Sequence, residues 1–296
     1  MTYIVARASP DIAFMISDTL LTPLFPIKGQ EGPVNGQYHA LKVQIVNENV
    51  AIGFSTSDNV DVCIEIINSV REALLQNGEL NVPNAILETY RKLRGQRHPY
   101  PDCEFLVIEL AATKKLSHVT SDTVRICERA YIGDPKAHQR ASRLRKTFDP
   151  PKTQFVQQPD GSLREVAVTM SDAEIDYRET SDAVDALVSE RRVAGVGAIG
   201  GYTLVVVNAR ISGKFEYMQS VERGRTPEEG VVGYALLAAN EGPRGVAIYY
   251  DGGRFGYVLP VGDASLCYKE RANSVQEFIA IAKEKHNLVL TGGTWE

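Results

Sequence analysis

The sequence predicts an α+β fold built on antiparallel sheet, because two hairpins near the start are followed by a change of hydrophobic period. Residues 2–18 form two β-rich runs around Ser9-Pro10-Asp11, a strong turn signal. Residues 40–54 repeat this arrangement around Asn47-Glu48-Asn49. From Asp58 to about Leu75, apolar residues then recur at the spacing of an amphipathic helix. Hairpins alternating with helices indicate antiparallel layers and not a parallel βαβ succession.

The remaining elements are expected from the same two periods. In chain order they are a helix over 83–93, strands over 103–112, 115–120 and 124–132, a helix from Asp134 to about Lys146, an exposed loop over 148–165, a helix over 171–193, strands over 202–210 and 214–221, a hairpin turning at Asp251-Gly252-Gly253 and a helix near 274–284.

Composition narrows the class of protein. The chain has 296 residues and a formal net charge of −5, which argues against partners recognised by bulk positive charge, such as nucleic acids or anionic membranes. No signal peptide is expected, and the apolar stretches are strand-sized, so we expect a soluble protein without a membrane partner. The four cysteines show no CxxC pair and are interpreted as buried thiols, which suits the cytoplasm.

The first hairpin places a carboxylate beside the start of the chain. If its turn is centred on Pro10, residues whose numbers sum to 20 face each other, and Thr2 lies opposite Asp18. Removal of Met1 would leave Thr2 with a hydroxyl and a free α-amine that can serve as its base. Taken singly, Thr2 could be an ordinary second residue and Asp18 an ordinary strand-end residue.

Lys42 strengthens this interpretation. It occurs in a strand that otherwise looks half buried, where a lysine is disfavoured unless it reaches water or meets a carboxylate. An edge or snorkelling lysine is the plain alternative. Paired with Asp18, the Lys42 ammonium could polarise the threonine hydroxyl and ease proton transfer.

Together, Thr2, the Ser17-Asp18-Thr19 strand end, Lys42 and Gly53-Phe54-Ser55 before a helix resemble the proteasome β-subunit family of N-terminal-nucleophile (Ntn) hydrolases. HslV- and Anbu-like bacterial proteins belong to that family. The resemblance extends to about residue 221, with its specific motifs in the first sixty residues. It implies a four-layer αββα sandwich of antiparallel sheets flanked by helices, with residues 1–222 as the Ntn domain and 223–296 as a C-terminal extension packed on it.

The resemblance also implies an activity, that of an N-terminal threonine peptidase or amidase working through a Thr2 acyl-enzyme. Lys42 and Asp18 would tune the nucleophile, Thr22 would contact the substrate backbone, and the backbone N–H near Thr56 would bind the oxyanion. The implied partners are a peptide or protein substrate, further copies of the chain in a homo-oligomer, and an ATPase that the sequence does not specify. A stand-alone enzyme would take a small amide. No cofactor is implied.

Two departures from the family pattern leave a second hypothesis open. Asp134 stands where the family has a serine, and residues 195–201 lack the family's auxiliary aspartate. Asp134 could cap the helix that follows it, or it could supply the missing carboxylate near the Thr2 amine. The alternative function is a catalytically impaired ring or scaffold subunit of the same family.

Other chemistries have little support in the sequence. The five histidines, His39, His98, His118, His138 and His286, lack metal-ligand spacing and are interpreted as surface or hydrogen-bonded residues. Residues 195–200 match GxGxxG, but the predicted helix precedes the glycines and the strand follows them, so no dinucleotide site is expected. Arg140, Arg143, Arg145 and Lys146 are interpreted as a solvated or subunit-facing helix surface.

Overall fold

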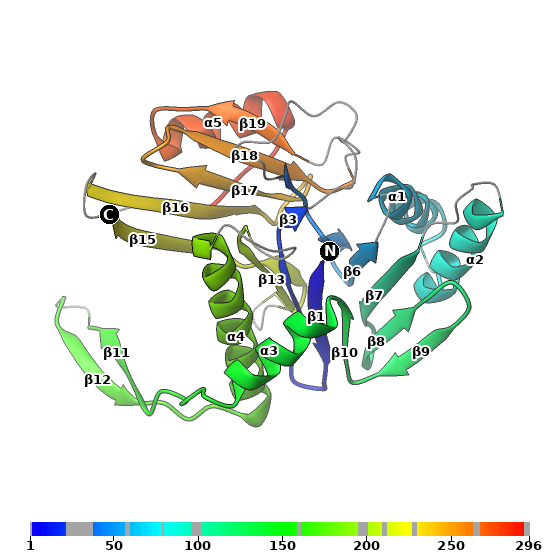
Figure 1. Ribbon diagram of the computed structural model, residues 1–296, viewed down its shortest axis with the longest axis horizontal. Helices are drawn as coiled ribbons and strands as arrows, with labels where there is room; N and C mark the ends of the chain where they lie inside the picture. The colour runs from blue at the N-terminus through cyan, green and yellow to red at the C-terminus, as the bar shows by residue number, and fades with distance from the viewer. Residues whose placement is uncertain are drawn as a thin grey trace.

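Three five-stranded antiparallel sheets organise the chain in the part that the computed structural model describes (Figure 1). The described residues are 2–21, 38–56, 60–78, 80–95, 102–158, 161–194, 201–208, 212–226, 230–262 and 267–292.

The first sheet contains the start of the chain and has the strand order β10-β1-β2-β13-β14. Its strands are β1 (Tyr3–Ala8), β2 (Ala13–Asp18), β10 (Arg129–Gly133), β13 (Thr203–Asn208) and β14 (Phe215–Tyr217). Helices α3 (Pro135–Arg145) and α4 (Asp172–Ala194) cover its outer face, where alternate strand residues such as Val5 and Ile16 pack on Ala141 and Leu187. The predicted first hairpin and the β13–β14 pair are both present.

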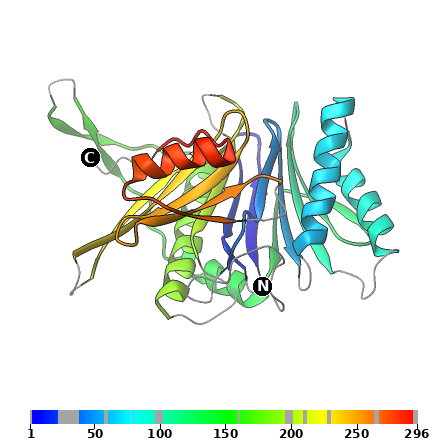
Figure 2. The ribbon, with the colours of Figure 1, turned by 90° about the horizontal axis from the view of Figure 1, so that it is seen from above.

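The second sheet has the order β5-β6-β7-β8-β9 and carries α1 and α2 on its outer face (Figure 2). Its strands are β5 (Val43–Asn47), β6 (Val50–Thr56), β7 (Cys103–Leu110), β8 (Lys114–Val119) and β9 (Val124–Cys127). The helices are α1 (Val60–Asn77) and α2 (Val82–Arg94). The single strand expected over 124–132 is wrong, because the chain leaves the second sheet after β9 and enters the first as β10.

The third sheet comes from the C-terminal part of the chain and has the order β15-β16-β17-β18-β19. Its strands are β15 (Ser220–Thr226), β16 (Gly230–Ala239), β17 (Gly245–Tyr250), β18 (Phe255–Pro260) and β19 (Tyr268–Arg271), followed by α5 (Val275–His286). The expected turn after Tyr250 joins β17 to β18, and Ser274 caps the expected helix α5.

The four-layer αββα sandwich is wrong as a description of this chain. The inner face of the third sheet, with Leu236, Ile248 and Leu259, belongs to the same buried cluster as Ile4 of the first sheet and Leu106 of the second. Three antiparallel sheets therefore bound one core, in place of two sheets between helical layers. Alternate residues of β16 are buried on both faces, because the opposite face of the third sheet packs on α5.

Two short ribbons complete the described structure. Strands β3 (Leu20–Leu21) and β4 (Tyr38–His39) pair close to the end of β2. Strands β11 (Thr153–Gln157) and β12 (Leu163–Ala167) form a hairpin that extends from the body of the molecule (Figure 1), so the loop expected over 148–165 is wrong. None of the helices in the described part of the chain is long and apolar enough to cross a membrane.

Candidate functional site

The register of the first hairpin differs by one residue from the expected one. Ser9 and Ile12 close the turn through a 2.9 Å backbone hydrogen bond, so its centre lies between Pro10 and Asp11 and not on Pro10. The numbers of two facing residues consequently sum to 21, as in the pair Ile4 and Ser17. The position level with Asp18 is that of Tyr3, and the expected Thr2–Asp18 pairing is wrong. A turn shifted by half a residue moves every pair in the ladder.

Asp18 nevertheless lies next to the start of the chain. Its Oδ1 atom accepts a 3.1 Å hydrogen bond from the backbone N–H of Tyr3, the residue directly after Thr2. By strand alternation, Thr2 belongs to the same face of the first sheet as Ile4, which packs in the core shared with the second sheet. The Thr2 residue is itself buried, with 5% of its surface exposed.

Lys42 and Asp18 form an ion pair that is completely buried. The Lys42 ammonium lies 2.9 Å from both carboxylate oxygens, and both side chains are 0% exposed. Lys42 immediately precedes β5, so the second sheet supplies the cation and the first sheet the anion. Burial lowers the pKa of Lys42 and outweighs the opposing effect of Asp18. Such a pair contributes little net stability, because desolvation opposes the attraction between the charges.

The Lys42 ammonium has a remaining donor. An ammonium has three N–H groups, and Asp18 is its hydrogen-bond acceptor within the described residues. The edge or snorkelling alternative does not apply to a fully buried lysine. In the part of the chain that the structure describes, the third N–H of this ammonium has no acceptor.

The end of β10 holds the backbone of Thr2 in place. The Thr2 carbonyl accepts a 2.8 Å hydrogen bond from the N–H of Asp134, and Gly133 pairs with Tyr3. Gly133 has a φ of +96°, and a β-carbon there would lie 1.8 Å from the Thr2 carbonyl oxygen. A glycine is required at position 133 for β10 to approach residue 2 this closely.

Asp134 caps α3 with its carboxylate. Its Oδ1 atom accepts hydrogen bonds from the backbone N–H groups of Lys136 at 2.8 Å and Ala137 at 3.3 Å. These are the ordinary contacts of an N-cap aspartate. Asp134 therefore contacts residue 2 through its backbone, while its side chain faces the helix.

The expected substrate-binding residues are only partly described. Thr56 is the last residue of β6 and pairs with Cys103, so it belongs to the strand and not to the loop before α1. Thr22 and residues 195–200 lie outside the described residues.

A second buried polar group lies beside the ion pair and was missed in the sequence. The Thr19 hydroxyl is 3.2 Å from His39 Nδ1 and accepts a 2.9 Å hydrogen bond from the Tyr202 N–H. Burial, and then the charge of Lys42, lowers the pKa of His39 to about 4. A histidine three residues before a lysine forms no motif, so only the fold reveals this contact.

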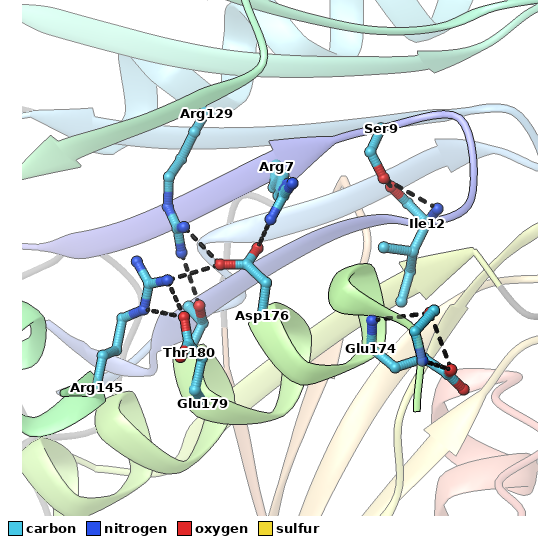
Figure 3. Close-up of polar contacts among 10 residues, drawn as sticks. Arg7, Ser9, Ile12, Arg129, Arg145, Glu174, Asp176, Glu179 and Thr180 are labelled. Atoms are coloured by element: carbon cyan, nitrogen blue, oxygen red, sulfur yellow. Dashed lines mark hydrogen bonds and ion pairs between the residues drawn. The ribbon is translucent and has the colours of Figure 1, made fainter. Parts of the chain in front are cut away.

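A cluster of arginines on the outer face of the first sheet is structural. Arg7, Arg129 and Arg145 converge on Asp176 of α4 (Figure 3), with Arg129 and Arg145 each 2.6 Å from its Oδ1. Burial alone would raise the pKa of Asp176, but hydrogen bonds from Arg7 and Arg129 hold it below its usual range. The network ties β1 and β10 to α3 and α4, so Arg145 is not a free surface charge. Glu179 also pairs with Arg145.

An open cleft of about 1110 Å³ lies at the end of β5. It is bordered by the end of β5, α1, β14 and the third sheet, and two of its charged residues, Lys214 and Glu48, pair at 2.6 Å. Among the described residues, no group of three or more His, Cys, Asp or Glu side chains could hold a metal ion.

No protein-family model and no curated protein matches this sequence. The resemblance to the proteasome β-subunit family thus depends on the residues quoted for it, and the hydrolase activity is a proposal.

Proposed function

We propose that this protein is an N-terminal threonine amidohydrolase or peptidase that acts through a Thr2 acyl-enzyme after removal of Met1. The observation that carries the proposal is the fully buried Asp18–Lys42 pair, whose carboxylate also accepts the N–H of the residue following Thr2. A buried ion pair adds little to stability, so its position beside a candidate nucleophile favours a chemical role.

In the proposed reaction the α-amine of Thr2 takes the proton of the Thr2 hydroxyl, and the oxygen attacks the substrate carbonyl. The Lys42 ammonium contributes its remaining N–H to stabilise charge on the attacking oxygen. The proton then passes to the leaving amine, the C–N bond breaks, and an ester to Thr2 remains. Water hydrolyses this ester and restores the hydroxyl. Thr22 and the backbone N–H near Thr56 are the proposed substrate contacts.

Three observations on the backbone and burial around residue 2 support this proposal. By strand alternation Thr2 belongs to the face of the first sheet that carries Ile4, and Lys42, directly before β5, pairs with Asp18 two positions after Ile16 on the neighbouring strand. The backbone of residue 2 is fixed by Asp134 on one side, while Asp18 fixes the adjacent residue. Such fixed geometry is what intramolecular proton transfer requires.

A catalytically impaired ring or scaffold subunit is the second candidate. The observation in its favour is that the Asp134 carboxylate is engaged by two N–H groups of α3 and is directed to the helix. The proposed amine would then lack the auxiliary carboxylate that the resemblance implies. In either case we propose a cytoplasmic homo-oligomer, and the four free thiols accord with a reducing compartment.

Intact-mass spectrometry and covalent labelling test the proposal on untagged protein. We expect loss of Met1 and acylation by a β-lactone that maps to Thr2, with no labelling in Thr2→Ala or Lys42→Met. Complete retention of Met1, or equal labelling of Thr2→Ala, would contradict the enzymatic proposal and leave the scaffold candidate. Light scattering tests assembly, since a species of only 32.6 kDa at micromolar concentration would exclude a stable ring.

A further inference from the structure

The Thr19 hydroxyl joins three segments that surround the Asp18–Lys42 pair. Thr19 directly follows Asp18, its carbonyl accepts the Ala40 N–H at 2.9 Å, and its hydroxyl contacts His39 and the Tyr202 N–H. His39 lies three residues before Lys42 in sequence. The group is enclosed, since Thr19 is 1% exposed and His39 and Tyr202 are each 4% exposed.

The Thr19 hydroxyl can act as both donor and acceptor in its two hydrogen bonds. The Tyr202 N–H can only donate, so the Thr19 oxygen accepts there and its own hydrogen is free to point to His39 Nδ1. We assign Nδ1 as the acceptor, which places the imidazole proton on Nε2. A neutral imidazole suits this position, because a second cation beside Lys42 would be repelled in a buried site.

The third sheet holds the His39 ring in place. Tyr257 of β18 lies 5.0 Å from it between ring centroids, and Tyr202 lies at 5.7 Å. Gly201 has a φ of +75°, and a β-carbon there would lie 2.5 Å from the Thr19 hydroxyl and 3.1 Å from the His39 ring. The segment before β13 can reach Thr19 because residue 201 has no side chain.

A second connection links the third sheet to the Lys42 segment. Gly262, two residues after the end of β18, donates its N–H to the Gln44 side chain at 3.2 Å, and Gln44 lies two residues after Lys42. The Gly262 carbonyl accepts a 2.9 Å hydrogen bond from the Asn68 side chain of α1. The third sheet therefore contacts the chain on both sides of Lys42.

We propose that His39 is a positioning residue for the Asp18–Lys42 pair, acting through the Thr19 hydroxyl and held by Tyr257 of the third sheet. This inference rests on the proposed function, in which the pair must stay in register with Thr2. Displacement of the cation by about 1 Å would be enough to lower the rate of Thr2 acylation roughly 100-fold.

Paired substitutions separate positioning from general destabilisation. Thr19→Val removes the hydroxyl at nearly constant shape, whereas Thr19→Ser retains it. His39→Leu removes the acceptor, whereas the Oδ1 of His39→Asn can replace Nδ1. His286→Asn is the matched control, since His286 also packs on a tyrosine ring, at 4.6 Å, and contacts a polar partner, Glu270, at 3.0 Å.

The first readout is the rate at which a β-lactone acylates Thr2. We expect a loss of about ten-fold or more in Thr19→Val and His39→Leu, with Thr19→Ser, His39→Asn and the control within about three-fold of the unsubstituted protein. Equal acylation rates in His39→Asn and His39→Leu would overturn the role of His39 as the hydrogen-bond acceptor of Thr19. If His286→Asn lowers the acylation rate as much as His39→Leu does, the effect is not specific to His39.

The second readout does not depend on Thr2 chemistry and uses the NMR signals of ¹³C-lysine-labelled protein. We expect the Lys42 side-chain resonance to move, and its titration midpoint to shift by about 0.5 pH unit or more, in Thr19→Val and His39→Leu. If the β-lactone does not acylate Thr2 but the Lys42 resonance shifts in these variants, the proposed enzymatic activity is wrong and the positioning contact still holds. Unchanged Lys42 signals in both variants would overturn the inference about His39, whatever the labelling shows.

Discussion

Lowering the pH from 7 to 5 should weaken folding through His39. Burial, and then the charge of Lys42, lowers the pKa of this side chain from 6.5 to about 4 in the folded protein. Between these values the unfolded chain binds more protons than the folded chain does, so stability falls as the pH falls. The contribution is fully present above pH 6.5, declines through that window and is lost by about pH 4.

The size of the effect follows from the two pKa values. At pH 5 the unfolded histidine is almost fully protonated and the folded one only about one-tenth so, and this shifts the unfolding equilibrium toward the unfolded state by a factor of roughly 30, or about 2 kcal/mol. Below about pH 4 the loss of unfolding free energy from His39 levels off at about 3 kcal/mol.

Urea unfolding followed by circular dichroism measures this contribution when the protein is compared with His39→Asn. Asparagine does not titrate, so any fixed effect of the substitution cancels between the two pH values. From pH 7 to pH 5 the unsubstituted protein should lose about 2 kcal/mol more than the variant does, while between pH 8 and pH 7 the two should agree within about 0.3 kcal/mol. If the unsubstituted protein and His39→Asn lose the same unfolding free energy between pH 7 and pH 5, His39 is not neutral and buried in the folded protein.

Three further pairs of substitutions test the site and its surroundings. Lys42→Met should lower the unfolding free energy by about 3–5 kcal/mol, because it leaves Asp18 charged and buried, and adding Asp18→Leu should restore most of this loss in urea titrations. Asp134→Asn should change the melting temperature little and leave acylation unaltered, whereas Asp134→Ala should lose about 1 kcal/mol of capping energy by the same thermal assay. Gly133→Ala should lose at least about 2 kcal/mol and abolish acylation, while Gly213→Ala, also at positive φ but with no atom within 4 Å of the added carbon, should lose only about 1 kcal/mol.

The elements set by local chemistry could be predicted from the sequence. Ser9-Pro10-Asp11 indicates the first turn, Asp134 and Ser274 begin α3 and α5, and the change in hydrophobic period marks α1. These features depend on residues within a few positions of one another. The sequence also indicated Asp18 and Lys42 as a pair worth testing.

Register and sheet number were decided by tertiary structure. The turn signal is compatible with a centre at Pro10 or beside it, and packing of alternate residues in two different cores selects the latter. The packing of the third sheet on the first two could not be predicted, because its strands pair with sequence neighbours while its core partners are distant in sequence. The inner face of β16 completes a core begun by β1 and β7.

The site shows the same division. Its residue types are legible in the sequence, since a threonine at position 2 and a lysine in an apolar run each restrict the chemistry. That Lys42 is wholly enclosed, that Asp134 caps a helix, and that His39 meets Thr19 follow from contacts across 24, 2 and 20 residues. Only the two-residue contact lies within the range of local sequence patterns. The other two exist because three sheets close around one core and exclude water from it.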